Sequence, residues 1–101
     1  MSSVIEWSLP ALDDLAEIAM WLRQEDAGLA EGMVRRIFAS AELLSPYPLA
    51  GRVGRVAGTR ELVVRRSPYL LVYLVEEARV VVVRVLHERK DWPGPDNSDA
   101  P

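Results

Sequence analysis

The fold is decided by residues 69–87, YLLVYLVEEARVVVVRVLH. This stretch contains an unbroken apolar run over 69–75, a polar interval over 76–78 and a valine-rich run over 79–87. Two runs of β-branched and aromatic residues joined by a tight turn are typical of a β-hairpin. The continuous hydrophobicity of 69–75 further predicts a central strand that is covered on both faces.

Alternation along the second strand of this hairpin predicts which side chains share a face, because successive residues of a strand point to opposite sides. One face should carry Val81, Val83, Val85 and His87. The other should carry Val80, Val82, Arg84 and Leu86. A further strand is predicted over 60–65, and the same alternation would place Arg65 and Arg66 on opposite faces.

Helical periodicity precedes the hairpin. Apolar residues recur at spacings of three and four, first at Leu12, Leu15, Ile18, Ala19 and Leu22, then at Ala30, Met33, Val34, Ile37, Ala41 and Leu44. Pro10 suits the first turn of the first helix, where its missing N–H group costs nothing. The short interval at 25–28 predicts that the two helices form an antiparallel hairpin, with Trp21 and Phe38 packed along it.

These segments predict the order β-α-α-β-β-β, with a first strand over 4–8. The glycines at 51, 54 and 58 mark a loop, and they match neither phosphate-binding glycine pattern. The fold class is therefore α+β, a helical hairpin packed on one face of a small, mostly antiparallel sheet. We expect one domain over residues 1–93 and a disordered tail over 94–101.

Composition excludes several kinds of chemistry. The 101 residues are enough for one domain, and 50% are hydrophobic. The chain has no cysteine, which excludes disulfides and thiolate catalysis, and His87 is its single histidine, so we expect no metal site and no cofactor. No apolar run reaches the roughly 20 residues that span a bilayer. The N-terminus does not resemble a signal peptide, and we expect a cytoplasmic protein without a membrane partner.

Charge is unevenly distributed along the chain. The net charge is −3, but residues 1–50 carry −5, residues 51–92 carry +4 and the last nine residues carry −2. A basic C-terminal half can form a local face for an acidic partner, or it can be a solvated sheet edge that carries arginines.

Five segments together resemble the RelE/ParE superfamily of bacterial toxins from type II toxin–antitoxin systems. They are ALDDLAEI (11–18), PYPLAGR (46–52), GTREL (58–62), SPYLLVY (67–73) and VLHERKDWP (85–93). The resemblance covers residues 4–93 and implies the same fold. It also implies a choice between two mechanisms, because RelE-like members cleave mRNA on the ribosome and ParE-like members poison DNA gyrase.

The resemblance places the RelE-type catalytic cations, two lysines and an arginine, at Glu61, Val63 and Leu70. None of these residues can carry a positive charge, and Glu61 would repel a phosphate. Losing one preorganised charge typically costs about 10²–10³ in rate, so we expect no catalytic residues here. His87 alone could act as a general base, but a structural or partner-contact role is the better interpretation.

The better match is a ParE-like toxin, which implies inhibition of DNA gyrase by binding. Interfaces of this kind depend on a few arginine and aromatic residues. The candidates for the toxic surface are Arg60, Arg84, His87, Arg89 and Trp92. Trp92 could instead be a hydrophobic plug at the end of the sheet.

The resemblance also implies a cognate antitoxin, ParD-like or similar, that wraps the toxin in a hetero-oligomeric complex. The hydrophobic surface of the helical hairpin and the less covered face of the sheet would receive it. The candidate contact residues are Leu15, Ile18, Leu22, Val34, Phe38, Arg65 and Tyr73. Two alternatives stay open, a ribosome-dependent mRNA endonuclease and a non-toxic module that only binds antitoxin.

Overall fold

A computed structural model describes residues 2–93, and the predicted disordered tail over 94–101 lies outside the described residues. The elements are β1 (Val4–Trp7), α1 (Leu9–Arg23), α2 (Ala27–Leu43), β2 (Arg52–Val53), β3 (Arg60–Val63), β4 (Tyr69–Glu76) and β5 (Arg79–His87). The predicted elements are all present. The structure adds β2 within the glycine loop, where two residues are too few to produce a periodic signal.

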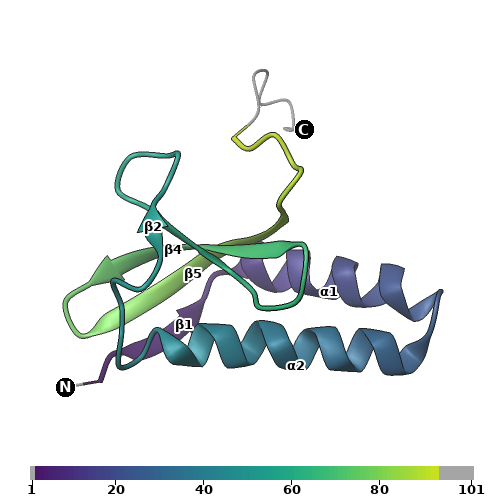
Figure 1. Cartoon of the computed structure of the whole chain (residues 1–101). Coiled ribbons are helices and arrows are strands. Elements are labelled where there is room, and N and C mark those ends of the chain that lie inside the picture. The colour runs from purple at the N-terminus through teal and green to yellow at the C-terminus, as the bar shows by residue number, and fades with distance from the viewer. Residues whose placement is uncertain (1, 94–101) are drawn as a thin grey trace.

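The strands form one sheet in the order β1-β5-β4-β3-β2. β1 runs parallel to β5, and the other neighbours are antiparallel, which confirms the predicted mostly antiparallel sheet. Figure 1 shows α1 and α2 side by side on one side of the sheet, with the C-terminal segment leaving on the other. β4 is central, and its first five residues are buried.

Both helices begin at capped N-termini. The Ser8 hydroxyl accepts a hydrogen bond from the Ala11 N–H (3.1 Å), and Pro10 lies in the first turn as predicted. One oxygen of Asp26 accepts from the Gly28 N–H (2.7 Å) and the Leu29 N–H (3.1 Å), and only three residues separate α1 from α2. Such caps satisfy backbone donors that a helix leaves open, so the hairpin bends where the sequence predicts it.

The main core lies between the helices and the sheet. Nearly all of the predicted helical stripe packs there, but Leu12 is 41% exposed and Ala11 is buried in its place. Trp21 is also wrongly predicted, because it is 61% exposed and does not pack between the helices. Phe38 packs at the edge of the hairpin against the ring of Trp7, with 4.9 Å between ring centroids.

A β-bulge interrupts β5 at Val83. Val72 pairs with Arg84, but the next residue of β4, Tyr73, pairs with Val82, so Val83 is left without a partner on β4. The Ser8 hydroxyl donates to the Val83 carbonyl (3.0 Å). An extra residue moves each following side chain of the strand to the sheet face opposite the one that simple alternation predicts.

The faces of β5 therefore differ from the prediction. Directly paired residues of antiparallel strands share a face. The helix-facing side of β5 consequently carries Val80, Val82, Val85 and His87, which pair with Val75, Tyr73, Leu71 and Tyr69. Grouping His87 with Val81 and Val83 is wrong, because the bulge adds one residue between them.

The sheet face opposite the helices is more covered than the sequence indicates. Leu70, Val72 and Leu86 form a buried cluster there, and Val83 and Trp92 pack against it. Trp92 is therefore placed as the alternative prediction described, as a hydrophobic side chain that packs onto this sheet face.

Candidate interaction surfaces

The three positions to which the resemblance assigns RelE-type cations share the sheet face opposite the helices. Glu61 pairs with Val72 and Val63 pairs with Leu70, so all four side chains lie on this face. Leu70 is buried beneath Trp92, and Val63 is half-exposed at the edge of β3. The fold brings these positions together, but it provides a carboxylate and two aliphatic groups there.

Glu61 is a buried carboxylate held by two arginines. It is 2% exposed, and its oxygens accept hydrogen bonds from Arg52 (Nη2, 2.9 Å) and Arg55 (Nε, 3.1 Å; backbone N–H, 3.0 Å). Burial by itself would raise the pKa of Glu61, but these hydrogen bonds and the charge of Arg55 outweigh it and lower the pKa to about 2. The carboxylate is therefore ionised at neutral pH, and its oxygens are already engaged.

His87 lies on the other side of the sheet from Glu61. Its ring packs edge-on against Tyr69, with 5.5 Å between centroids and 80° between planes, and its Nδ1 atom accepts from the Arg89 N–H (3.0 Å). A general base and a general acid must reach the same phosphodiester group. His87 and Glu61 face opposite sides of the sheet, so they do not form such a pair.

Arg84 joins β5 to α1. Its guanidinium donates to both carboxylate oxygens of Asp14 (2.7 and 3.0 Å), and the same carboxylate accepts from the Val85 N–H (2.9 Å). This two-point pairing is the strong geometry of arginine with a carboxylate. The guanidinium of Arg84 is thus paired with the carboxylate of Asp14.

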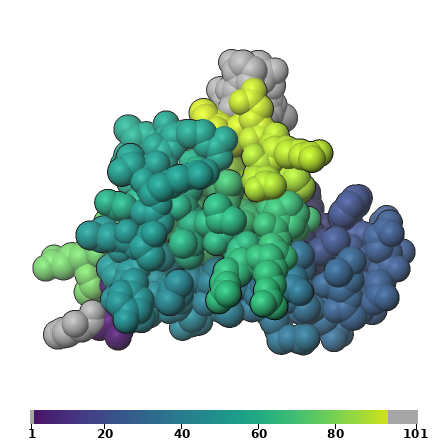
Figure 2. All heavy atoms as spheres, viewed as in Figure 1, coloured from purple at the N-terminus to yellow at the C-terminus, as the bar shows by residue number. Residues whose placement is uncertain are grey.

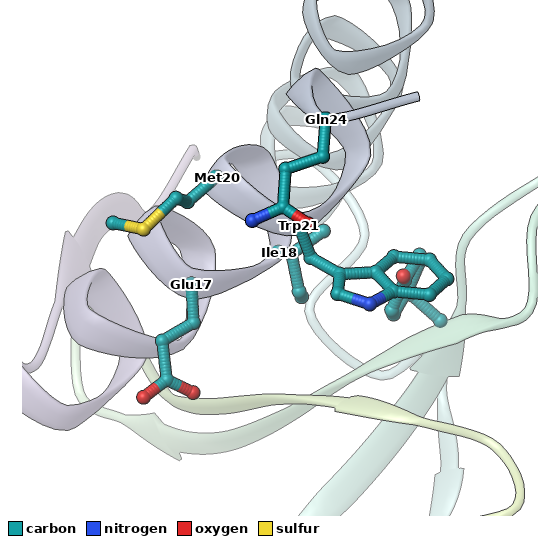
Figure 3. A pocket seen from close by; sticks show the side chains of 6 residues that line it. Glu17, Ile18, Met20, Trp21 and Gln24 are labelled. Carbon is teal, nitrogen blue, oxygen red and sulfur yellow. The ribbon is translucent and has the colours of Figure 1, made fainter. Parts of the chain in front are cut away.

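A shallow groove runs between α1 and the end of β5. One part, of about 300 Å³, is lined by His87, Arg84 and Lys90 together with residues of α1. It shares Trp21 and Tyr69 with an adjoining hollow of about 420 Å³ along α1. Figure 3 shows Trp21 projecting from α1 on the opposite side from Met20. We call the two hollows together the α1/β5 groove.

The structure therefore divides the predicted toxic-surface candidates. Arg84 and His87 line the α1/β5 groove, and Arg89 follows it in the exposed segment after β5. Trp92 packs on the opposite sheet face, and Arg60 lies on β3, where it donates to the Gly51 carbonyl (2.7 Å). Sequence reasoning missed Trp21 as a surface residue, although its position beside the apolar stripe of α1 could have shown it.

The predicted antitoxin contacts divide in the same way. Leu15, Leu22 and Tyr73 are buried and are not part of the accessible surface in this structure. Ile18 and Val34 are partly buried against the core. Phe38 and Arg65 are exposed, so the prediction stays open for the four accessible residues.

Arg65 and Arg66 lie in the turn between β3 and β4, beyond the end of β3. Both line a groove between α2 and β3, so their predicted separation onto opposite faces is wrong. Strand alternation does not apply to this turn, where Arg66 has a φ of 56°.

The Tyr73 hydroxyl fixes the loop before β2. It donates to the Pro48 carbonyl (2.8 Å) and accepts from the Gly51 N–H (2.8 Å). A Cβ atom on Gly51 would lie 2.7 Å from this oxygen and 2.6 Å from the Glu61 carbonyl, so glycine is required there. Burial raises the pKa of Tyr73 and outweighs the Gly51 hydrogen bond, so the hydroxyl is protonated and available as a donor.

Two further properties concern the described part of the chain. Residues 2–93 contain no group of three or more histidine, cysteine, aspartate or glutamate side chains that could hold a metal ion. No helix within the same residues has the length and apolar character needed to cross a membrane.

Sequence comparison identifies the relatives of the chain. Residues 5–92 match the family model described as the ParE toxin of the type II toxin–antitoxin system parDE. The putative toxin Y4kP of Sinorhizobium fredii is 37% identical over 88% of this chain and 92% of its own length. Toxin RelE2 of Caulobacter vibrioides is 37% identical over 86% of this chain and 96% of its own.

Solved structures show the same fold. The chromosomal ParDE system of P. aeruginosa contains a chain that matches with a TM-score of 0.77 at 22% identity, covering 85% of this chain and 96% of that one. The toxin–antitoxin complex RelBE2 of Mycobacterium tuberculosis matches with a TM-score of 0.65 at 25% identity, covering 86% and 92%.

Proposed function

The chain belongs to the ParE family of type II toxin–antitoxin toxins, and from this we propose that it stops growth by binding DNA gyrase without cleaving RNA. The observation that carries the proposal is the buried Glu61 with its two arginines, at a position where a ribonuclease of this superfamily would present a cation. The Glu61 carboxylate is held by Arg52 and Arg55, and it cannot itself supply the positive charge that would stabilise a phosphodiester transition state.

The acid–base requirements of RNA cleavage support the same proposal. A general base works best when its pKa lies near the operating pH, and the pKa of Glu61 is about 2. His87 is the single histidine of the chain, but it lies on the opposite sheet face from Glu61. This arrangement favours a toxin that acts by holding its target rather than by chemistry.

We place the target-binding surface at the α1/β5 groove. Trp21 is 61% exposed there, beside Tyr69, His87 and the cation Lys90. Tryptophan, tyrosine and arginine are the residue types that most often dominate the binding energy of protein interfaces. Of the predicted candidates, Arg84, His87 and Arg89 belong to this surface or follow it directly.

We also propose a cognate antitoxin, ParD-like or similar, in a hetero-oligomeric complex. The structural neighbours include chains from ParDE, RelBE and DinJ-YafQ toxin–antitoxin systems, which supports such a partner. Co-expression with its antitoxin should raise the soluble yield, because the free toxin exposes apolar side chains on both helices. Equal yields with and without antitoxin would count against this partner.

A ribosome-dependent mRNA endonuclease is the second candidate, because a relative at 37% identity is named Toxin RelE2. Purified chain can be assayed in parallel for inhibition of gyrase supercoiling and for mRNA cleavage in a translating extract. We expect inhibition of supercoiling and intact mRNA. Cleavage of mRNA that is lost in His87→Ala would replace our proposal with the endonuclease.

Two variants locate the surface. Trp21→Ala should weaken gyrase inhibition at least tenfold, because it removes the exposed indole of the α1/β5 groove. Tyr47→Ala is the matched control, since Tyr47 is equally exposed but lies after α2 and outside this groove. Induced expression in bacteria completes the test, and normal growth would instead favour a non-toxic module that only binds antitoxin.

A further inference from the structure

The α1/β5 groove contains a buried tyrosine whose hydroxyl has no partner within the described part of the chain. Tyr69 is 6% exposed and lines both hollows of the groove. Its hydroxyl makes no hydrogen bond with any of residues 2–93, whereas every fully enclosed polar side-chain atom in that range has a partner. The hydroxyl therefore reaches the open space of the groove. Burial raises the pKa of Tyr69, so at neutral pH the hydroxyl is protonated and can donate to a ligand.

Two charged side chains of the groove also have no ion-pair partner. Arg84 and Asp14 neutralise each other, because the guanidinium donates to both carboxylate oxygens. Glu17 on α1 and Lys90 after β5, in contrast, form no ion pair within residues 2–93. In Figure 2 the yellow segment 88–93, which carries Lys90, lies above the dark-blue atoms of α1. The groove thus offers a ligand one carboxylate and one ammonium group.

An exposed indole and an imidazole accompany these groups. Trp21 is 61% exposed and follows Glu17 by four residues, so the two are neighbours on the surface of α1. Figure 3 shows the Glu17 carboxylate and the Trp21 indole extending from consecutive turns of the helix. The Nδ1 atom of His87 accepts from the Arg89 N–H, so a neutral ring carries its proton on Nε2. This N–H group is a further donor in the hollow that Lys90 lines.

We propose that the α1/β5 groove binds a guanine nucleotide. The indole of Trp21 would stack on the base, and the carboxylate of Glu17 would accept from the two adjacent donors of guanine, its ring N–H and its amino group. The ammonium of Lys90 would pair with the phosphate, and the Tyr69 hydroxyl would donate to a sugar or phosphate oxygen. Hollows of about 420 and 300 Å³ have the size of small-molecule sites. The inference goes beyond the proposed function, because this binding needs no protein target.

The carboxylate of Glu17 is the reason for choosing guanine. Guanine presents two neighbouring donors on its Watson–Crick edge, while adenine and cytosine present a donor beside an acceptor that a carboxylate repels. An aromatic side chain of a peptide would also stack on Trp21, but it would leave Glu17, Lys90 and the Tyr69 hydroxyl without partners. A purely cationic ligand would be repelled by Lys90. A base with an attached phosphate therefore fits these groups best.

The probe is guanosine monophosphate (GMP), titrated into the full chain and followed through the indole N–H signals in NMR spectra. The signal that is absent from Trp21→Ala identifies Trp21. We expect it to shift with a dissociation constant below about 1 mM, whereas AMP and guanosine should bind at least tenfold more weakly, because each lacks one charge-assisted contact. Calorimetry should show that Trp21→Ala abolishes binding of GMP and that Tyr47→Ala, at an equally exposed ring outside the groove, does not change it.

Glu17→Gln tests the contact with the base through a readout that a purely structural role would not move. A glutamine amide offers a donor and an acceptor, the pattern that matches adenine. The variant should lose at least tenfold in affinity for GMP and should bind AMP better than GMP. Glu31→Gln makes the same change at an exposed residue of α2 outside the groove, and its affinity for GMP should stay within twofold of wild type.

Tyr69→Phe tests the unpartnered hydroxyl. It should weaken GMP binding about threefold or more, which is the effect of one neutral hydrogen bond. The midpoint of thermal unfolding should stay unchanged, because the hydroxyl has no partner within residues 2–93 that its removal would affect.

Two sources supply the same chemistry, the free nucleotide and a guanine nucleotide within a DNA strand. A single strand of thymidines with one central deoxyguanosine distinguishes them. Binding of this strand that is tighter than that of GMP and depends on Glu17 would identify the strand as the ligand, and weaker binding would identify the free nucleotide. Three outcomes would overturn the proposal: equal affinity for GMP and AMP, an unchanged base preference in Glu17→Gln, or no shift of the Trp21 signal at about 5 mM GMP.

These measurements are separate from the gyrase assay. A chain that inhibits gyrase but does not bind GMP would contradict the nucleotide site alone. A chain that binds GMP with the expected base preference but does not affect gyrase would contradict the proposed target and not the nucleotide site.

Discussion

At the scale of single residues, Glu61 has the greatest influence on what this chain can do. An unpaired carboxylate buried to this degree would be strongly destabilising. Here Arg52 and Arg55 surround it, so the ionised form is the stable one. The same three residues tie β2 and the following loop to β3. Glu61 therefore acts as a structural anchor that joins these segments.

Glu61→Gln tests this anchor. The pKa of Glu61 is lowered from 4.5 to about 2 on folding, so ionisation contributes up to about 3 kcal/mol of stability above pH 4.5. That contribution is lost as the pH falls from 4.5 toward 2. Urea unfolding should show Glu61→Gln about 2–3 kcal/mol less stable than wild type at pH 7, and this difference should shrink as the pH falls from 4.5 toward 2. Glu77→Gln, at an exposed position, is the control and should change stability by less than about 0.5 kcal/mol.

Tyr73→Phe removes a hydroxyl that fixes the loop before β2. The Gly51 N–H would then lose its partner in a buried site, which costs about 1–3 kcal/mol. Denaturant unfolding should show this loss, and hydrogen exchange of the Gly51 amide should accelerate. Tyr47→Phe removes the same group from a 62% exposed ring and should have little effect. Equal effects of the two substitutions would show that the hydroxyl does not hold the loop.

At this scale the sequence predicted what a side chain can do chemically better than it predicted which residues surround that side chain. It noted that Glu61 cannot act as a cation, but the two arginines that neutralise it lie six and nine residues away on a loop without periodicity. It also predicted that Trp21 packs along the helical hairpin, whereas this side chain is 61% exposed. Trp21 lies next to an apolar stripe that Leu22 and Ile18 already fill, and hydrophobicity alone does not reveal that competition.

At the scale of elements, Asp14 links α1 to the edge of β5. β1 pairs with β5 only as far as Val82, so the edge of β5 beyond it needs another partner. The Asp14 carboxylate supplies one by accepting from the Val85 N–H and from Arg84. A helix side chain thus continues the hydrogen bonding that a longer β1 would have provided.

Asp14→Asn should separate α1 from this edge. It removes the negative charge opposite Arg84 and replaces one acceptor oxygen with a donor, so we expect a loss of about 2 kcal/mol. Thermal unfolding measures the loss, and faster exchange of the Val85 amide locates it. The neighbouring Asp13→Asn is the control, because Asp13 is exposed. If Asp13→Asn lowered stability as much, the effect would come from the charge of α1 in general.

The elements themselves were largely predictable, since periodicity and turn residues fixed both helices and the strands from β3 to β5. Two local features were not. The bulge at Val83 lies within a run of four valines, where no residue differs enough to mark it. β2 has only two residues, and its pairing with β3 depends on the Glu61 cluster rather than on its own propensity.

At the scale of the whole molecule, two tryptophans define two different surfaces. Trp92 packs against the buried cluster on the sheet face opposite the helices, and Trp21 is exposed on α1. Trp92→Ala should therefore lower stability by about 2–3 kcal/mol through lost burial. Trp21→Ala should change stability by less than about 1 kcal/mol and act on target binding instead. Urea unfolding of both variants beside the supercoiling assay measures the two effects, and the reverse assignment would contradict the proposed surface.

The Glu61 cluster has a consequence for how such toxins can diverge. Placing a lysine at position 61 would set a third cation beside Arg52 and Arg55 in a buried site. Replacing the two arginines first would leave an unpaired buried carboxylate, a loss of roughly 3–5 kcal/mol for a marginally stable fold. Either order of substitution therefore passes through a less stable protein. The three residues are therefore coupled, and a cation can be placed at position 61 without loss of stability only if the surrounding arginines change with it.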